Sequence, residues 1–498
     1  MLYICVNKCG INKGKVGEFM YSGIIFSVSV LIVLALFFVF RKKTSETFNK
    51  FAKVLVVVYC AIGFFRFFLS DSFIYVINGA NFNGKYYDTT DVLQTILRWG
   101  YYMGYVVVPM AVFFDSRLWK NLMSYVFLPF AILSAVFVND YMVYFLDPIG
   151  HGLHFATWFR YLFFILELVL AIVIPVIVQI KHKHVFNFKD KIEWRNFLLA
   201  LPCVIIVMMP VYVPQSLIGY SKLLAEIGSP FHIAWIAVSV ILTLFLYYMF
   251  RFSSYRIRYM LIVFLTLALF YNYDSCFLMG FTLSRLPIQL CNLASYIYMI
   301  AIIFKREKFF QFAFLANITG AIIAFIASDF SGGAFKFWNV HFVYEHTLVL
   351  MIPALAMGLR VFPRITRKAL AYSAIGFTIY FIFCVTAGVL INGFVENTTE
   401  SKLLVNYFFM FDLDKALKYV PFISIIKYTK FVIGNFTFYP LLAVIIYFAF
   451  SILYILFYKL TKVLYVFEDD RLELRRSAID LYEKRTKKVC RIRRDFQD

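Results

Sequence analysis

Charge is scarce in this sequence of 498 residues, and acidic charge is scarcest. Asp and Glu number 28 against 49 Lys and Arg, and charged residues make up 15% of the chain. Soluble domains carry about 25% charged residues, so the composition argues against a soluble globular protein. No phosphate-binding loop, dinucleotide fingerprint or paired CxxC zinc pattern is present. We therefore expect neither a cofactor nor a bound metal.

The beginning of the chain lacks a secretory leader. Residues 1–20 contain no apolar segment that ends in a small-residue cleavage site. We expect no removable signal peptide, and we assign residues 1–20 to a short extracytoplasmic N-terminus. The first membrane span, from about Tyr21, would then direct its own insertion.

Apolar residues dominate the composition of the chain. They form 62% of the chain, and Phe, Trp and Tyr together form 20%. Runs of about 18–25 apolar residues, each long enough to cross a hydrocarbon core of roughly 30 Å, recur along the whole length. None shows the two-residue alternation of an outer-membrane barrel. The sequence predicts an all-α, polytopic membrane protein with about 13 transmembrane helices, at 21–40, 51–77, 99–114, 120–138, 158–180, 196–213, 231–250, 258–273, 286–304, 309–327, 341–359, 369–391 and 431–458.

Basic residues gather in every second loop between these spans, whereas the other loops hold most of the acids. The net charge of +21 follows this alternation, which is the positive-inside pattern. It excludes nucleic acid as the main partner and predicts a multi-pass protein of the plasma (cytoplasmic) membrane, with the N-terminus outside and the C-terminus cytoplasmic. Residues 403–430, which are apolar but broken by charges, are expected to be interfacial or re-entrant rather than spanning. Nothing in the sequence predicts an oligomeric state.

The last segment, 459–498, is rich in Lys and Arg with aliphatic residues between them. It predicts a basic cytoplasmic helix. Such a helix either lies on anionic lipid headgroups or serves as a solvated anchor that fixes orientation.

The chain contains an internal repeat. "FILELVLAIVIPVIV" from Phe164 aligns without gaps with "FVYEHTLVLMIPALA" from Phe342, so that Phe, Glu and Pro coincide. "FFDSRLW" and "IFKREKF" correspond upstream. We predict two parallel six-helix units, a diverged one at 21–215 and a second within 228–458, plus one extra helix.

Polar residues near the outer end of the second unit form the candidate site. Glu345 and His346 are adjacent in an apolar span, where ionisable groups are costly and mark function or pairing. Glu345 recurs as Glu167 in the first unit, so we expect it to form a structural ion pair with Arg285. His346 has no such copy. It is predicted to lie level with Cys291, about one turn into its helix.

Several short segments resemble a known family. "GSPFHIAW" (228–235), "RLPIQLCNLA" (285–294) and "GGAFKFWNVHFVYEH" (332–346) resemble the YwaF-like integral membrane proteins, and the resemblance covers residues 228–458. That family is distantly similar to an animal transmembrane phospholipid acyltransferase in which a Cys and a His are implicated. The resemblance places the His at His346. It places the Cys near Cys291, about one turn beyond the position directly after Pro287.

Three functions fit this pattern. The first is Cys/His-dependent acyl transfer on phospholipids near the outer leaflet, with Cys291 as nucleophile and His346 as base. Gln289 or Asn292 would stabilise an oxyanion, and His232 and His341 would contact substrate. The second is a transporter or flippase of a small or lipid substrate, and the third is a non-catalytic membrane scaffold. In all three the partners are membrane lipids.

Overall fold

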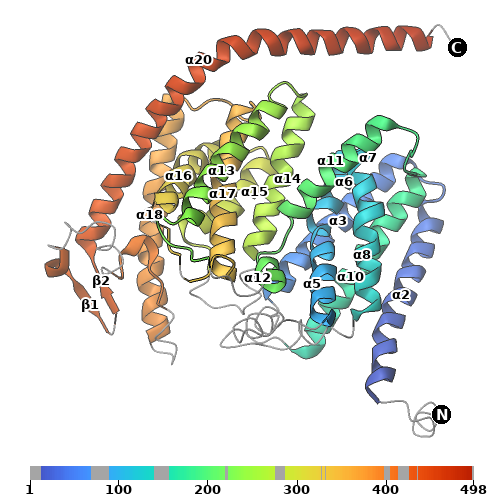
Figure 1. Ribbon diagram of the computed structural model, residues 1–498, viewed down its shortest axis with the longest axis horizontal. Helices are drawn as coiled ribbons and strands as arrows, with labels where there is room; N and C mark the ends of the chain where they lie inside the picture. The colour runs from blue at the N-terminus through green and yellow to red at the C-terminus, as the bar shows by residue number, and fades with distance from the viewer. Residues whose placement is uncertain are drawn as a thin grey trace. The chain divides into compact units, whose positions relative to one another are not determined.

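The computed structural model (Figure 1) describes residues 13–68, 89–138, 156–218, 223–274, 286–326, 328–330, 332–396, 404–412, 426–434 and 436–495. It confirms an all-α polytopic architecture. Within the described ranges, ten helices are long and apolar enough to cross a membrane. The chain divides into two compact units. Unit 1 comprises Met1–Leu224, Phe270–Arg285 and Ser331–Phe342, and unit 2 comprises Ala225–Leu269, Leu286–Phe330 and Val343–Asp498.

Unit 1 is a helical bundle built around α10, which packs against α2, α3 and α8. Its helices are α2 (Lys13–Phe40), α3 (Ser45–Phe68), α5 (Thr89–Tyr102), α6 (Gly104–Phe114), α7 (Arg117–Leu122), α8 (Leu128–Val136), α10 (Thr157–His182), α11 (Lys191–Val207) and α12 (Val213–Ile218). A single π-helical turn, Met123–Phe127, joins α7 to α8, so the two form one span.

Stacked tyrosines fill the centre of unit 1. The Tyr105 ring stacks on Tyr59 and, with ring centroids 4.6 Å apart, on Tyr271. Its hydroxyl donates to the fully buried carboxylate of Glu167. Because a buried carboxylate requires hydrogen-bond donors, this tyrosine holds α6 and α10 together through both apolar and polar contacts.

Unit 2 is organised around α16, which contacts α15, α18 and α20. Its helices are α13 (Pro230–Phe250), α14 (Tyr255–Asp274), α15 (Leu290–Ile303), α16 (Glu307–Ile326), α17 (Phe337–Gly358), α18 (Arg367–Glu396) and α20 (Pro440–Asp495), and the ends of α14 and α17 belong to unit 1. A 3-10 turn (Tyr407–Phe409) and the antiparallel hairpin of β1 (Phe431–Ile433) and β2 (Phe436–Phe438) precede α20.

Three expected spans differ from the ten candidates. The segment 196–213 corresponds to α11, which ends at Val207, and 286–304 corresponds to the 14-residue α15. The segment 258–273 lies in α14, which has two arginines near its start and Asn272 and Asp274 at its end. These helices are too short or too polar to count as spans by length and composition alone.

The start of the last span was also predicted wrongly. Residues 431–438, expected to be helical, form the hairpin, and α20 begins at Pro440. Gly434 adopts a φ of 59° in the hairpin turn, a conformation that glycine takes without steric cost. The aromatic and β-branched residues on either side of Gly-Asn in "FVIGNFTF" suit a hairpin better than a helix.

The basic tail is helical, as expected. α20 continues from the span through the tail to Asp495 (Figure 1). Two contacts hold the junction: Tyr247 donates to the Glu468 carboxylate, and the Arg364 guanidinium lies 3.9 Å from the ring centroid of Tyr465. The beginning of the tail is therefore fixed to unit 2.

The tyrosine stack predicts which glycines tolerate a side chain. A Cβ on Gly63 of α3 would overlap the Tyr105 ring, whereas a Cβ on Gly23 of α2 would meet nothing within 4 Å. Gly63→Ala should destabilise the protein by roughly 1–3 kcal/mol through overpacking. Gly23→Ala should be neutral or slightly stabilising because alanine favours helices. Thermal unfolding in detergent measures both, and equal midpoints for the two variants would contradict the packing described.

Candidate functional site

Cys291 lies on the first turn of α15, at a turn that α18 holds in place. The carbonyl of Ile288 accepts hydrogen bonds from the Tyr380 hydroxyl, at 2.6 Å, and from the Cys384 thiol, at 3.5 Å. Tyr380 and Cys384 are four residues apart and so lie on one face of α18. Two donors on one carbonyl fix the backbone three residues before Cys291.

The other side of Cys291 faces α16 at a glycine. A Cβ on Gly320 would lie 3.1 Å from Leu290 Cδ2 and 3.5 Å from Cys291 Sγ. A larger residue at 320 would push α15 away, because its side chain would need the space that Leu290 and Cys291 occupy. The thiol is half-buried, and its electrostatic neighbours are Glu345, Tyr298 and Tyr380.

The acid and the histidine of α17 are both buried. Glu345 is 3% exposed and His346 is 6% exposed. Successive helix residues point about 100° apart, so the two side chains leave α17 in different directions. The structure brings Glu345 into electrostatic range of Cys291.

Hydrogen bonds next to His346 fix the rotation of α17. Thr347 Oγ1 accepts from the Trp235 indole at 2.9 Å and lies 2.8 Å from the Ser239 hydroxyl, both on α13. On the neighbouring turn, the Tyr298 hydroxyl of α15 donates to the Val349 carbonyl at 3.0 Å. Because α13 and α15 both bind α17 here, the direction of the His346 side chain is determined by packing.

His232 is held by the backbone at both ring nitrogens. Its Nδ1 accepts from the Gly228 N–H at 2.9 Å, so Nε2 carries the proton and donates to the Phe325 carbonyl at 2.7 Å. Ser328 Oγ lies 3.2 Å from the same nitrogen. The neutral imidazole thus joins the start of α13 to the end of α16, and the structure places it as a bridge between these helices.

The remaining predicted residues lie in different surroundings. Gln289 is the exposed N-cap residue of α15 and makes no side-chain cap bond, and half-buried Asn292 follows on the first turn. His341 is buried on α17 within unit 1, with aromatic neighbours Tyr273, Phe337 and Trp338. Arg285 lies outside the described residues.

Sequence reasoning missed the residues that support Cys291. Gly320, Tyr380 and Cys384 come from helices 29 to 93 residues away along the chain. The spacing of Tyr380 and Cys384 by one helical turn was the available signal, but it is common in apolar helices. Their role depends on which helices meet, and one sequence does not give that information.

The buried Glu167, the counterpart of Glu345, has a tyrosine donor in unit 1. The structure shows Tyr105 donating to Glu167, while Arg98 Nε donates to the Tyr212 hydroxyl at 3.3 Å. A neutral hydroxyl thus serves as a partner of this membrane-buried carboxylate.

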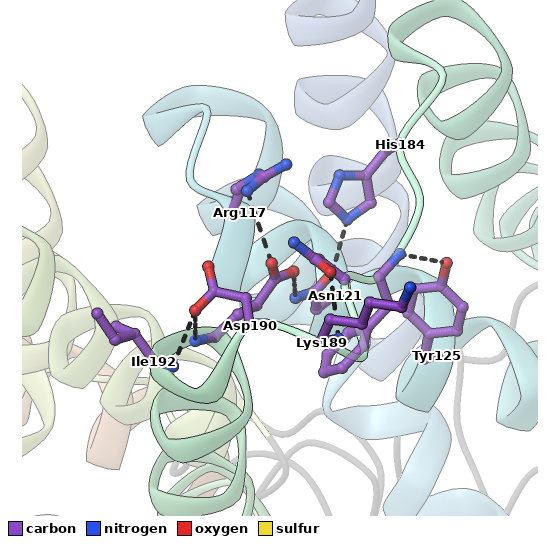
Figure 2. A network of polar contacts seen from close by, with 10 residues as sticks. Arg117, Asn121, Tyr125, His184, Lys189, Asp190 and Ile192 are labelled. Atoms are coloured by element: carbon purple, nitrogen blue, oxygen red, sulfur yellow. Dashed lines mark hydrogen bonds and ion pairs between the residues drawn. The ribbon is translucent and has the colours of Figure 1, made fainter.

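A second polar network lies at the basic end of unit 1 (Figure 2). The His184 Nε2–H donates to Asn121 Oδ1 at 2.6 Å, and Asn121 Nδ2 donates to Glu193 Oε1 at 2.6 Å. The Arg117 guanidinium lies 3.6 Å from the other Glu193 oxygen. Asp190 caps α11 by accepting from the Ile192 and Glu193 N–H groups. The network ties α7, the loop that follows α10, and α11 together.

Neither the surroundings of Cys291 nor the network at His184 forms a metal site among the described residues. Within the described residues, no group of three or more His, Cys, Asp or Glu side chains is placed to hold a metal ion.

Comparison with known proteins identifies one relationship. Residues 227–461 match the model of the TMEM164 family, a family of membrane proteins. The match spans α13 to the beginning of the tail and includes Cys291, Glu345 and His346. No curated protein and no solved structure matches the chain.

The His184 network predicts a pH dependence of stability. Burial, together with the nearby positive charge of Lys120, lowers the pKa of His184 below its ordinary value. Protonation therefore favours the unfolded state, and stability should fall as the pH drops below about 6.5, the pKa of an unfolded histidine.

The test compares the wild type with His184→Gln, because glutamine can donate to Asn121 and does not titrate. Thermal unfolding midpoints are measured at pH 7.5, 6.5 and 5.5. The wild-type midpoint should drop further than that of the variant. Parallel curves would assign the acid sensitivity to the other histidines, which both proteins share.

Proposed function

We propose that this protein transfers acyl chains between phospholipids, with Cys291 as the nucleophile and His346 as its general base. The observation that carries the proposal is the way Cys291 is held in place. This potentially nucleophilic residue lies on the first turn of α15, which α16 and α18 hold, and it interacts electrostatically with Glu345, the buried acid that precedes His346. Both residues lie in the part of the chain that matches the TMEM164 family of membrane proteins. The resemblance of "VYEH" and "RLPIQLCNLA" to the YwaF-like proteins supplies the reaction class.

The attacking species at Cys291 would be the thiolate, because a thiol is a weak nucleophile. A general base is therefore needed at the moment of attack. His346 is the base in this proposal.

The reaction would proceed in two balanced steps. The thiol sulfur attacks the carbonyl carbon of a phospholipid ester while the imidazole takes the thiol proton, and a thioester forms as the lysophospholipid hydroxyl leaves with that proton. The hydroxyl of a second lysophospholipid then attacks the thioester, and the thiol is restored. One ester is exchanged for another, so the cycle needs no cofactor.

The other site residues take supporting roles in the proposal. Gln289 or Asn292, at the start of α15, would donate to the oxyanion of each tetrahedral intermediate. His232 and His341 would contact the headgroup, and Arg285 would pair with Glu345. We also propose that the site opens near the outer leaflet of the plasma membrane, with the C-terminal tail on anionic lipid of the cytoplasmic face.

Backbone geometry supports the proposed duplication. Asp115 and Lys305, which coincide in the aligned repeat, both have positive φ, at 47° and 51°. Lys183 and Arg360, within one residue of corresponding positions, end α10 and α17 in the same conformation. Non-glycine residues rarely adopt it, so its recurrence at two matching helix ends favours common ancestry of the two six-helix units.

Transfer of a labelled chain tests the function. The purified protein in vesicles is given a phosphatidylcholine with a deuterated acyl chain and an unlabelled lysophosphatidylethanolamine, and mass spectrometry follows the label. Cys291→Ser and His346→Gln should each lower transfer by a factor of about 100 or more. Cys203→Ser, a change of an exposed cysteine on α11, should leave it unchanged.

Two other results of this assay would contradict acyl transfer through Cys291 and His346. Transfer that persists in both site variants would contradict the proposal. Movement of intact labelled lipid between leaflets, with no new acyl combination, would assign the protein to the flippases instead.

The proposed ion pair has its own test. Arg285→Glu and Glu345→Arg should each lower folded yield, because each leaves two like charges near lipid. The double variant should recover it if the two side chains are partners. Yields of the double variant no better than those of the single variants would exclude this pairing.

A further inference from the structure

A crevice runs between α2 and α10 at the basic end of unit 1 and is distinct from the surroundings of Cys291. On α2 it is lined by residues at helical spacing on one face, Val33, Leu36, Phe37 and Phe40, and Arg41 follows directly after the helix. Ile177, Ile180 and Lys181 of α10 form the other wall, and Phe48 and Lys183 complete it. The cavity measures about 200 Å³.

The crevice is apolar along its length and cationic at one end. Arg41, Lys181 and Lys183 stand at that end, and none of the described lining residues is acidic. Lys181 Nζ donates to the carbonyls of Phe40 and Lys43, at 2.9 and 2.8 Å. These bonds fix its ammonium at the C-terminal end of α2.

The other two cations remain available for a ligand. Arg41 and Lys183 are exposed, and neither forms an ion pair with any residue that the structure describes. Lys183 follows the last residue of α10 in a left-handed conformation with a φ of 47°. Three positive charges thus meet at one end of an apolar wall, and none of the described residues that line the crevice is an acid.

We propose that this crevice binds one anionic phospholipid. Its phosphate lies against Arg41 and Lys183, and the upper part of one acyl chain lies along Val33, Leu36 and Ile177. The setting favours a lipid, because α2 is an apolar candidate span of which only 11% is buried within the protein. Basic pockets between transmembrane helices suit anionic headgroups. This inference is independent of the proposed acyl transfer.

A second basic cavity shows by contrast why the apolar wall matters. About 760 Å³ in volume, it lies in unit 2 and is lined by Lys305, Arg306, Lys308 and Lys368 together with Glu307 and Gln311. It has cations but also an acid and few aliphatic side chains. The crevice in unit 1 combines cations with an apolar wall, and no acid is among its described lining residues. The cations would bind the headgroup of a lipid, and the apolar wall would bind its acyl chain.

The experiment measures lipid binding to the full chain in a neutral detergent. Dioleoylphosphatidylglycerol is titrated, and the thermal unfolding midpoint is followed to obtain a half-saturation concentration. Dioleoylphosphatidylcholine tests the need for negative charge, and glycerol phosphate tests whether the headgroup alone suffices. The wild type should be stabilised saturably by phosphatidylglycerol and by neither of the other two.

Two variants locate the effect. Arg41→Gln combined with Lys183→Gln should raise the half-saturation concentration about tenfold or more, because two hydrogen bonds to a charged group are lost. Leu36→Trp should also raise it, since the indole fills the crevice without changing any charge. A matched control, Lys42→Gln with Lys189→Gln, removes two exposed cations that do not line the crevice and should bind as the wild type does.

Specific outcomes would overturn the proposal. If the crevice variants bind phosphatidylglycerol like the wild type, the lipid binds elsewhere, for example on the tail, which they retain. An equal loss in the control would show a diffuse effect of net charge. A shift of the same size with glycerol phosphate would assign the cations to a free phosphate. Leu36→Trp keeps the test valid if the double variant fails to fold.

Discussion

Polar groups in hydrocarbon must be satisfied from within the protein, and this constraint shapes both units. Where water is absent, a buried donor or acceptor without a partner costs several kcal/mol. The chain meets the constraint by using polar side chains as ties between helices. Tyr105 donates to Glu167, His232 binds backbone on both sides, and Thr347 accepts from Trp235. Each of these hydrogen bonds also fixes the rotation of a helix about its axis, which apolar packing alone would leave free.

The same constraint gives the surroundings of Cys291 their form. The carbonyl of Ile288, in the turn before α15, lies outside regular helix and so needs donors. Tyr380 and Cys384 provide them. Satisfying one backbone group thereby places the thiol relative to α18, and Gly320 permits α16 to approach from the other side. The precise placement that the proposed nucleophile would require thus follows from a requirement of the membrane.

Much of this could be read from the sequence, and the limits have physical causes. Apolar runs predicted most spans, because hydrocarbon thickness dictates helix length. Composition does not distinguish a helix from a hairpin in a short apolar stretch, and 431–438 was therefore misassigned. Glu345 and His346 were recognised because ionisable groups stand out in a span. Tyr380 was not, because a tyrosine in an apolar helix is ordinary until its neighbours are known. Tyr105, which donates to Glu167, was not recognised for the same reason.

The continuity of α20 has a mechanical consequence. Its 56 residues share one hydrogen-bond ladder, and at 1.5 Å per residue they extend about 84 Å. The tail is therefore joined to the last span by continuous helix, and the contacts at Glu468 and Tyr465 lie where the two meet. A displacement of the tail would reach α13 through Tyr247, and it would reach the residues that follow α17 through Arg364.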